Sequence, residues 1–189
     1  MDMIVDADDL LIRRLRDDPS DYELIVRWRN EPHVREWWDP DDPPMTLAAA
    51  IQEYRADTRE GSPTTACIIE SAGEPTGFLQ FYRWADDPPA AEALGLSFDD
   101  DAWGLDLFIG EPSRVGSGVG PRVIDLVCRF LFEDRGASSV ALVAAQNNSR
   151  ALRAYEKAGF RRGPSVLDTD TRNGQRVPSW LMTRDAPPA

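Results

Sequence analysis

A glycine-rich segment in front of a helix pattern is the first feature of this sequence that could do chemistry. Residues 114–120 read Arg-Val-Gly-Ser-Gly-Val-Gly, after an apolar run typical of a strand and at the start of a helical pattern over residues 119–132. Glycines allow tight turns in which several N–H groups face one point, and a helix N-terminus adds partial positive charge. The segment suits a pyrophosphate, although a plain turn has the same composition.

Two familiar nucleotide motifs fit this glycine segment poorly. A P-loop ends in Gly-Lys-Ser/Thr, whereas this segment ends in Gly118-Val119-Gly120. A dinucleotide fold carries its motif on the first strand of a parallel unit, and here the glycines lie more than halfway along the chain, after a predicted hairpin. A phosphate site of another kind is therefore indicated.

A second segment, residues 148–160, has the pattern of a short helix with a polar start. Asn148 is a cap for a helix over residues 149–158, and Gly159 ends it. Three residues share one face of that helix: Ala151, Leu152 and Tyr155. Taken alone, Tyr155 is typical of a half-buried core aromatic.

Together, the two segments resemble the GNAT superfamily of N-acetyltransferases, and the resemblance is strong over residues 103–160. In that superfamily the glycine loop binds the pyrophosphate of CoA, the asparagine contacts the pantetheine arm, and the tyrosine often protonates the departing thiolate. The resemblance therefore implies acetyl-CoA as co-substrate and these two roles for Asn148 and Tyr155. One departure is that the family has Gln or Arg where Val115 stands, and Arg114 lies one residue early. The implied cofactor-binding residues are Phe108, Ile109, Arg114, Val115, Gly116, Ser117, Gly118, Val119, Gly120, Asn148, Ala151 and Lys157.

A narrower resemblance to aminoglycoside 6'-N-acetyltransferases spans most of the chain. It rests on residues 33–38 (His-Val-Arg-Glu-Trp-Trp), residues 73–82 and residues 104–106 (Gly-Leu-Asp). In those enzymes Glu-Trp-Trp helps to wall the sugar site, and an aspartate at the position of Asp106 binds the amine or helps to deprotonate it. Some of them carry an acid where residues 143–146 read Val-Ala-Ala-Gln, which leaves the preferred aminoglycoside open. The expected substrate-binding residues are Trp37, Trp38, Gln80, Tyr82, Glu92, Asp99 and Asp106.

Charge and burial agree with a cationic substrate. Asp106 lies in an otherwise apolar strand pattern, where an unpaired carboxylate is costly to bury, unless the side chain points to solvent. Just before it, residues 85–101 form a predicted long loop with several acids, which could equally be a solvated surface. Trp37 and Trp38 cannot both face inward from a strand, so one of them could line a cleft. His33, the only histidine, is expected to be structural.

The mechanism implied is direct transfer in a ternary complex. A backbone N–H near Phe108 or Ile109 would polarise the thioester carbonyl. Asp106 would hold the ammonium and accept a proton through water, and Tyr155 would protonate the thiolate. No cysteine belongs to a recognisable nucleophile motif, so an acyl-enzyme is not expected.

Composition limits the other possibilities. The chain has 189 residues and a formal net charge of −12, which predicts one domain over residues 1–189, with a core at about 10–184, and disfavours a nucleic acid partner. There is neither an apolar run of membrane-spanning length nor a signal-peptide pattern, so we expect a cytoplasmic protein with no membrane partner. Cys67 and Cys128 are expected to be reduced and packed, no metal site is expected, and the protein should be a monomer or homodimer.

The predicted elements give a mixed α/β fold, with a mostly antiparallel sheet flanked by helices. A helix should begin at Ser20, with Glu23 completing a capping box, and another should follow a Thr46 cap. A turn at residues 73–75 should join two strands into a hairpin. The predicted strands are residues 10–16, 64–70, 76–84, 103–109, 139–144, 161–167 and 177–183.

Two alternatives stay open. The same fold could act on another amine, such as a siderophore lysine, a polyamine or a protein N-terminus. The chain could also be a non-catalytic module that binds CoA or an antibiotic.

Overall fold

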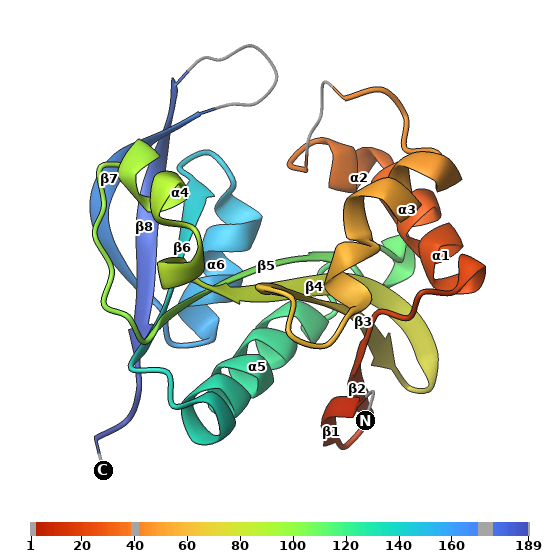
Figure 1. Cartoon of the computed structure of the whole chain (residues 1–189), viewed down its shortest axis with the longest axis horizontal. Helices are drawn as coiled ribbons and strands as arrows, with labels where there is room; N and C mark the ends of the chain where they lie inside the picture. Colours follow the sequence, from red (N-terminus) through yellow and green to blue (C-terminus); the bar gives the residue numbers. More distant parts are fainter. Residues whose placement is uncertain (1–2, 39–41, 170–175, 189) are drawn as a thin grey trace. The chain divides into compact units, whose positions relative to one another are not determined.

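The computed structural model describes residues 3–38, 42–169 and 176–188, which form two compact units (Figure 1). Unit 1 comprises Met1–Phe81 and Asp106–Val123, and unit 2 comprises Tyr82–Leu105 and Ile124–Ala189. The prediction of a single domain over residues 1–189 stays a prediction.

The described strands belong to one sheet in the order β1-β2-β3-β4-β5-β6-β8-β7. The pairs β1–β2, β2–β3, β6–β8 and β7–β8 are antiparallel, and β5–β6 is parallel. This confirms the predicted mixed α/β fold. The strands are β1 (Met3–Ala7), β2 (Leu10–Arg14), β3 (Thr64–Ser71), β4 (Glu74–Arg83), β5 (Ala102–Ile109), β6 (Ser139–Ala145), β7 (Arg161–Thr169) and β8 (Arg176–Asp185).

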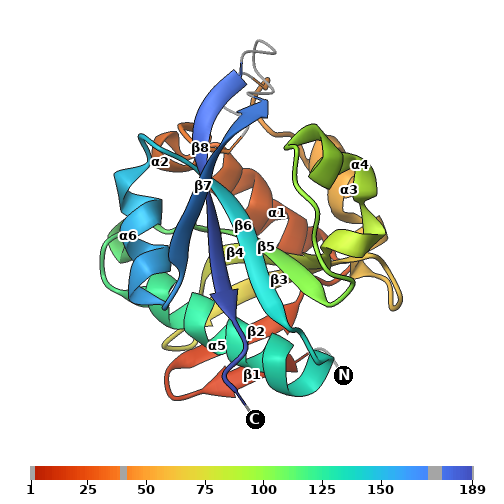
Figure 2. The same ribbon diagram turned by 90° about the vertical axis from the view of Figure 1, so that its left-hand side faces the viewer.

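Helices flank the strands in each unit. In unit 1, α1, α2 and α3 gather on one side of β2–β4 (Figure 1), and α1 packs against both α2 and α3. In unit 2, α6 and α4 lie on opposite sides of β6 and β8 (Figure 2). The helices are α1 (Pro19–Arg29), α2 (Pro32–Arg35), α3 (Leu47–Tyr54), α4 (Pro88–Ala93), α5 (Val119–Arg135) and α6 (Ser149–Lys157), with 3-10 turns η1 (Ala56–Thr58), η2 (Trp84–Asp86) and η3 (Pro112–Arg114).

Several local predictions need correction. Asp18, not Ser20, caps α1: its Oδ1 accepts from the Ser20 N–H at 2.9 Å, because Pro19 takes the first helical position. Residues 85–101 are not a plain loop, since they contain α4, which starts at a proline pair capped by Asp87. Four further differences are that β1 and α2 were not predicted, α5 continues to Arg135, and the hairpin turn is Ala72–Gly73.

The hairpin turn begins one residue earlier than predicted because both of its residues have positive φ angles. Ala72 and Gly73 have φ angles of 53° and 79°. A two-residue turn that matches strand twist needs positive φ at both positions. Glu74 and Pro75 therefore belong to β4.

The predicted Thr46 cap on α3 is confirmed. The Thr46 hydroxyl accepts from the Ala49 N–H at 3.2 Å.

Each unit has its own apolar cluster. In unit 1, fully buried side chains of α1 pack with Phe78 of β4 and Phe108 of β5, whose rings stack at 5.4 Å. In unit 2, Trp84 stacks on Phe98 at 4.4 Å and packs with Ala141 of β6 and Leu181 of β8. Burial of apolar area is the main stabilising contribution to each cluster.

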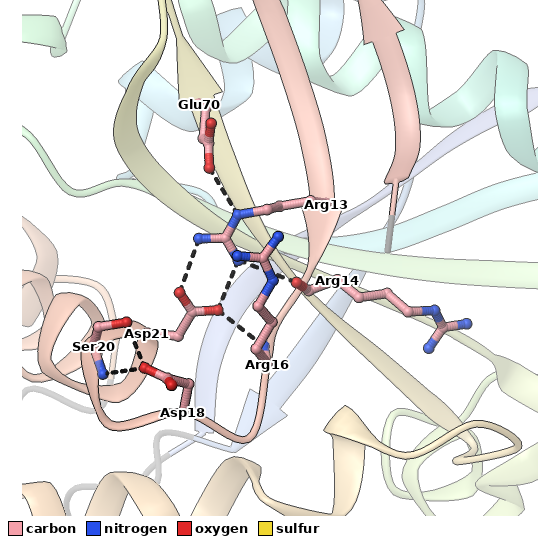
Figure 3. A network of polar contacts seen from close by, with 7 residues as sticks. All are labelled: Arg13, Arg14, Arg16, Asp18, Ser20, Asp21 and Glu70. Atoms are coloured by element: carbon pink, nitrogen blue, oxygen red, sulfur yellow. Dashed lines mark hydrogen bonds and ion pairs between the residues drawn. The ribbon is translucent and has the colours of Figure 1, made fainter. Parts of the chain in front are cut away.

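Arg13 of β2 is buried against the start of α1 and joins three segments (Figure 3). Its guanidinium donates to both Asp21 carboxylate oxygens at 2.6 and 2.8 Å, and its Nε donates to Glu70 of β3 at 2.7 Å. Asp21 also accepts from the backbone N–H of Arg16 at 2.9 Å. The Arg13 and Asp21 side chains are 9% and 5% exposed, so solvent screens this pair little.

Asp21→Asn should destabilise the protein by about 3 kcal/mol or more, because it leaves the buried Arg13 cation without its ionic partner. Asp9→Asn is the matched control, since Asp9 pairs with Arg122 at the surface and both side chains are about half exposed. Urea unfolding of both variants measures the difference. Equal, small losses of stability would show that the buried bridge adds nothing beyond a surface pair.

Candidate functional site

Asp106 lies on the apolar strand β5 with one carboxylate oxygen oriented by a neighbour. Its Oδ2 accepts a hydrogen bond from Gln80 Nε2 of β4 at 3.0 Å, and both side chains are half-buried. A half-buried carboxylate held in this way keeps a defined direction while part of it stays accessible. Two of the predicted substrate-binding residues of unit 1 are thus brought together.

The backbone of β5 distinguishes between the two predicted N–H donors. A Cβ on Gly77 would lie 2.3 Å from the Phe108 carbonyl oxygen, so that carbonyl faces β4. Neighbouring residues of a strand direct their backbone groups to opposite edges. The N–H and carbonyl of Ile109 therefore face away from β4, and the Ile109 carbonyl accepts from His33 Nε2 at 2.9 Å. Of the two predicted donors, Ile109 is thus the one whose N–H is not directed at β4.

The end of β5 is held by α1. A Cβ on Gly110 would lie 2.1 Å from the ring of Trp28, so only glycine fits beneath this fully buried indole. The Trp28 Nε1–H donates to Glu111 at 3.0 Å, and Arg27 also pairs with Glu111. These contacts fix the point at which the glycine segment begins.

The glycine segment forms the predicted turn into α5. Gly116 and Gly118 have φ angles of 77° and 89°, which explains the residue type at both positions. A Cβ on either would meet nothing within 4 Å, so the space around them is open. The turn is closed by Ser117, whose hydroxyl donates to the Arg114 carbonyl at 2.6 Å. Val115 and Arg114 are half-buried, Val119 is buried as the first residue of α5, and Gly120 follows it.

The two tryptophans of residues 33–38 follow α2 in a turn and not in a strand, which corrects the reason for their expected orientation. Trp38 packs edge-on against Phe78 and Phe108, at 5.9 and 5.0 Å between ring centroids. Trp37 is half-buried and is not a member of that cluster. Trp38 therefore supports the side of β5 that carries Phe108, and the predicted role of both tryptophans in substrate binding stays a prediction.

In unit 2, helix α6 presents the second set of predicted cofactor residues. Asn148 caps it, with Oδ1 accepting from the Ala151 N–H at 3.0 Å, which leaves the side-chain NH₂ as the group that could reach a ligand. Tyr155 is half-buried, with its ring 5.7 Å from that of Phe160. Lys157 is exposed at the last residue of the helix.

The predicted substrate-binding residues of unit 2 differ in their exposure to solvent. Tyr82 is half-buried and its ring covers Gly104, where a Cβ would lie 2.5 Å from the ring. Glu92 is exposed on α4, and Asp99 is exposed near the start of β5, with its backbone carbonyl accepting from the Ala102 N–H at 2.9 Å. The predicted role in substrate binding of these three residues stays a prediction.

The thiols are not suited to nucleophilic chemistry. Cys67 and Cys128 are free and buried, and burial raises the pKa of each thiol to about 12.

Within the described part of the chain, no group of His, Cys, Asp and Glu side chains could hold a metal ion. No described helix is both long and apolar enough to cross a membrane.

Sequence reasoning missed the contacts that hold the end of β5. Glu111, Trp28 and Gly110 were not singled out, although a glycine directly after an apolar strand and before an acid was visible in the sequence. The hydrogen bond between Trp28 and Glu111 spans 83 residues, so no local pattern could pair them. Only a fold that lays α1 against β5 brings them together.

Comparisons with known proteins agree on one family. The sequence-family model described as the acetyltransferase (GNAT) domain matches residues 17–167 of this chain. Aminoglycoside N(6')-acetyltransferase type 1 of Klebsiella pneumoniae is 27% identical over 90% of this chain and 87% of its own length. N-hydroxyputrescine acetyltransferase of Acinetobacter baumannii is 26% identical over 74% of this chain and 61% of its own. A crystal structure of an aminoglycoside acetyltransferase with coenzyme A and kanamycin superposes with a TM-score of 0.74, covering 93% of this chain and 94% of that one at 26% identity.

Gly110→Ala should lower the stability of the protein by about 1–3 kcal/mol, because the added methyl would overlap the ring of a fully buried indole. Gly120→Ala is the control, since a Cβ there meets nothing within 4 Å and alanine favours a helix start. Thermal or urea unfolding separates the two. A Gly110→Ala protein as stable as the control would mean that α1 does not press on the end of β5.

Proposed function

The chain belongs to the GNAT family of acetyl-CoA-dependent N-acetyltransferases, and we propose that its amine substrate is the 6'-amine of an aminoglycoside. The observation that carries the proposal is Asp106, a half-buried carboxylate on an apolar strand with one oxygen held by Gln80. Such a group suits a reacting ammonium, because it offers charge and a proton acceptor in a setting of low dielectric. The likeness to aminoglycoside acetyltransferases over 90% of the chain supports it.

The glycine segment is proposed to hold the pyrophosphate of CoA. Positive φ at Gly116 and Gly118 turns the backbone immediately before α5, and the space around both glycines is open. The first N–H groups of an α-helix have no partner within the helix and favour an anion. In α6, the NH₂ group of Asn148 is proposed to contact the pantetheine arm, since its oxygen already caps the helix.

The proposed reaction uses the direction of the groups on β5. The N–H of Ile109 would donate to the thioester oxygen as charge develops there. Asp106 would orient the ammonium and take its proton through water, after which the amine attacks the carbonyl carbon. The C–S bond then breaks, and Tyr155 would give its proton to the CoA thiolate. The second proton on the new amide nitrogen would leave through water and restore the Tyr155 hydroxyl. With both cysteine thiols protonated and buried, a direct transfer is the simplest route.

The acidic surface of unit 2 supports a cationic substrate. Six carboxylates of residues 85–101 are exposed, and that stretch contains no lysine or arginine. An aminoglycoside carries several ammonium groups, which such a surface attracts over roughly a Debye length of 8–10 Å. The exposed acids are Asp86, Asp87, Glu92, Asp99, Asp100 and Asp101.

A second candidate substrate is a polyamine or its N-hydroxylated derivative. It is favoured by the match to N-hydroxyputrescine acetyltransferase, which covers 74% of this chain. The same acidic surface would attract a linear diamine. A panel of aminoglycosides, diamines and hydroxylated diamines, assayed for thiol release from acetyl-CoA, separates the two candidates.

Tyr155→Phe should lower kcat about 10²–10⁴-fold and leave acetyl-CoA affinity nearly unchanged, because it removes only the hydroxyl that would protonate the thiolate. The ring contact with Phe160 is retained in this variant. Steady-state kinetics and calorimetric titration with CoA measure the two quantities. A wild-type rate would assign Tyr155 to packing and leave water as the proton donor.

Asp106→Asn should abolish aminoglycoside acetylation and preserve acetyl-CoA binding, because it removes charge and proton acceptor but keeps shape. The weaker aminoglycoside binding that remains should be less sensitive to salt, since one charge pair is gone. Asp134→Asn, which removes an exposed charge near the end of α5, is the control and should leave acetylation intact.

Wild-type protein should acetylate kanamycin or tobramycin and spare an analogue with a 6'-hydroxyl. If it acetylates diamines and no aminoglycoside, the family assignment stands and the proposed substrate is wrong.

A further inference from the structure

The peptide unit between Ile109 and Gly110 is held at both of its ends. On the side of β4, the Gly110 N–H donates to the Thr76 carbonyl at 2.9 Å. On the opposite side, the Ile109 carbonyl accepts from His33 Nε2 at 2.9 Å. Because a peptide unit is planar, hydrogen bonds at its two ends fix its orientation. His33 therefore holds the end of this peptide unit that β4 does not contact.

His33 reaches this carbonyl from a short helix that is anchored in the core of unit 1. The next residue of α2, Val34, is 3% exposed and belongs to the same apolar cluster as Phe108 of β5. A carbonyl oxygen only accepts hydrogen bonds, so Nε2 of the imidazole carries the hydrogen. The donor and the strand that it contacts are thus fixed to one another through a shared core.

This hydrogen bond affects the proposed thioester site because of how a strand directs its backbone groups. The N–H and the carbonyl of one strand residue point to the same edge, so an oxygen that accepts from the Ile109 N–H lies beside the Ile109 carbonyl oxygen. Two oxygens with partial negative charge repel, and the repulsion grows as the ligand oxygen gains charge in a site of low dielectric. A hydrogen bond donated by His33 offsets the negative charge of the Ile109 carbonyl.

We propose that His33 is a positioning residue for acetyl transfer, which orients the Ile109 peptide and offsets the charge of its carbonyl beside the thioester oxygen. The inference rests on the proposed function and adds to it a residue from α2. His33 acts through the backbone and touches no reacting atom. With its Nε2–H donated to a carbonyl, it has a role other than that of a general base.

His33→Leu should lower kcat about 5- to 10-fold with kanamycin as acceptor, the change that corresponds to the loss of one hydrogen bond. KM for acetyl-CoA should stay within about 2-fold, because the ground-state carbonyl carries little of the charge that develops in the transition state. Steady-state kinetics of the full chain measures both.

Two amide variants test whether the donor itself matters. His33→Gln offers a side-chain N–H at nearly the reach of Nε2 and should keep kcat within about 3-fold of wild type. His33→Asn is one bond shorter, so its amide falls short of the carbonyl and kcat should drop as in His33→Leu. It provides the measurement if His33→Leu does not fold.

Asn30→Leu is the matched control. Asn30 is also half-buried in unit 1, and its Nδ2 donates to the backbone carbonyls of Val26 and Met45 at 2.8 and 2.9 Å. Its replacement removes side-chain hydrogen bonds to backbone carbonyls without touching β5. The control should lower stability in urea unfolding and leave kcat unchanged.

Infrared spectroscopy adds a measurement that needs no amine. Acetyl-CoA labelled with ¹³C at the thioester carbonyl should show a lower stretching frequency when bound to wild-type protein than when free, because a donor polarises the carbonyl. In His33→Leu the frequency should move back toward that of free acetyl-CoA. His33→Gln and Asn30→Leu should retain the wild-type frequency.

The outcomes separate this inference from the proposed function. A lower kcat and a raised carbonyl frequency in His33→Leu or His33→Asn, with both restored in His33→Gln, support the positioning role. Folded His33→Leu protein with wild-type kcat and frequency overturns it and leaves the proposed function in place, as does a control that shifts both values equally. Wild-type protein that binds no acetyl-CoA overturns the proposed function and this inference with it.

Discussion

The contact between Trp28 of α1 and the end of β5 determines where Asp106 and the glycine turn of unit 1 lie. Glycine is the only residue type that fits beneath the indole at position 110, and Glu111 accepts a hydrogen bond from the indole N–H. Because the chain is fixed at these two positions, the strand before them and the glycine turn after them have defined starting points. Asp106 lies on β5, four residues before Gly110. Gly116 follows Gly110 after the 3-10 turn η3.

Helix α1 can exert this constraint because it is itself tied to the sheet. The bidentate bond from Arg13 to Asp21 joins β2 to the first turn of α1, and the Nε of Arg13 continues the connection to Glu70 on β3. A buried ion pair adds less net stability than its geometry suggests, because both charges lose hydration. Its direction is specific, however, and a helix held at its first turn presents Trp28 to β5 in one orientation.

The two units contribute different groups to the proposed reaction. Unit 1 carries a carboxylate oriented by Gln80, an edge N–H at Ile109 and an open glycine turn. Unit 2 carries the capped helix α6, with Tyr155 on it, and an exposed acidic segment over α4. The acids belong to a packed segment because the apolar side chains between them, Phe98 among them, cover Trp84. The exposed acids of this segment are thereby held in place without burying a carboxylate.

Local chemistry determined much of this protein from the sequence alone. Positive φ at Gly116 and Gly118, the Asn148 cap and most of the strands followed from preferences that act over a few residues. The prolines at the start of α4 misled the same reasoning, because they suit a loop and a first helical turn equally well. Tertiary structure alone decided which groups meet: Trp28 with Glu111 over 83 residues, His33 with Ile109 over 76, and Trp84 with Ala141 over 57. Such pairs depend on how helices and strands pack, and packing is a property of the whole chain that no short pattern encodes.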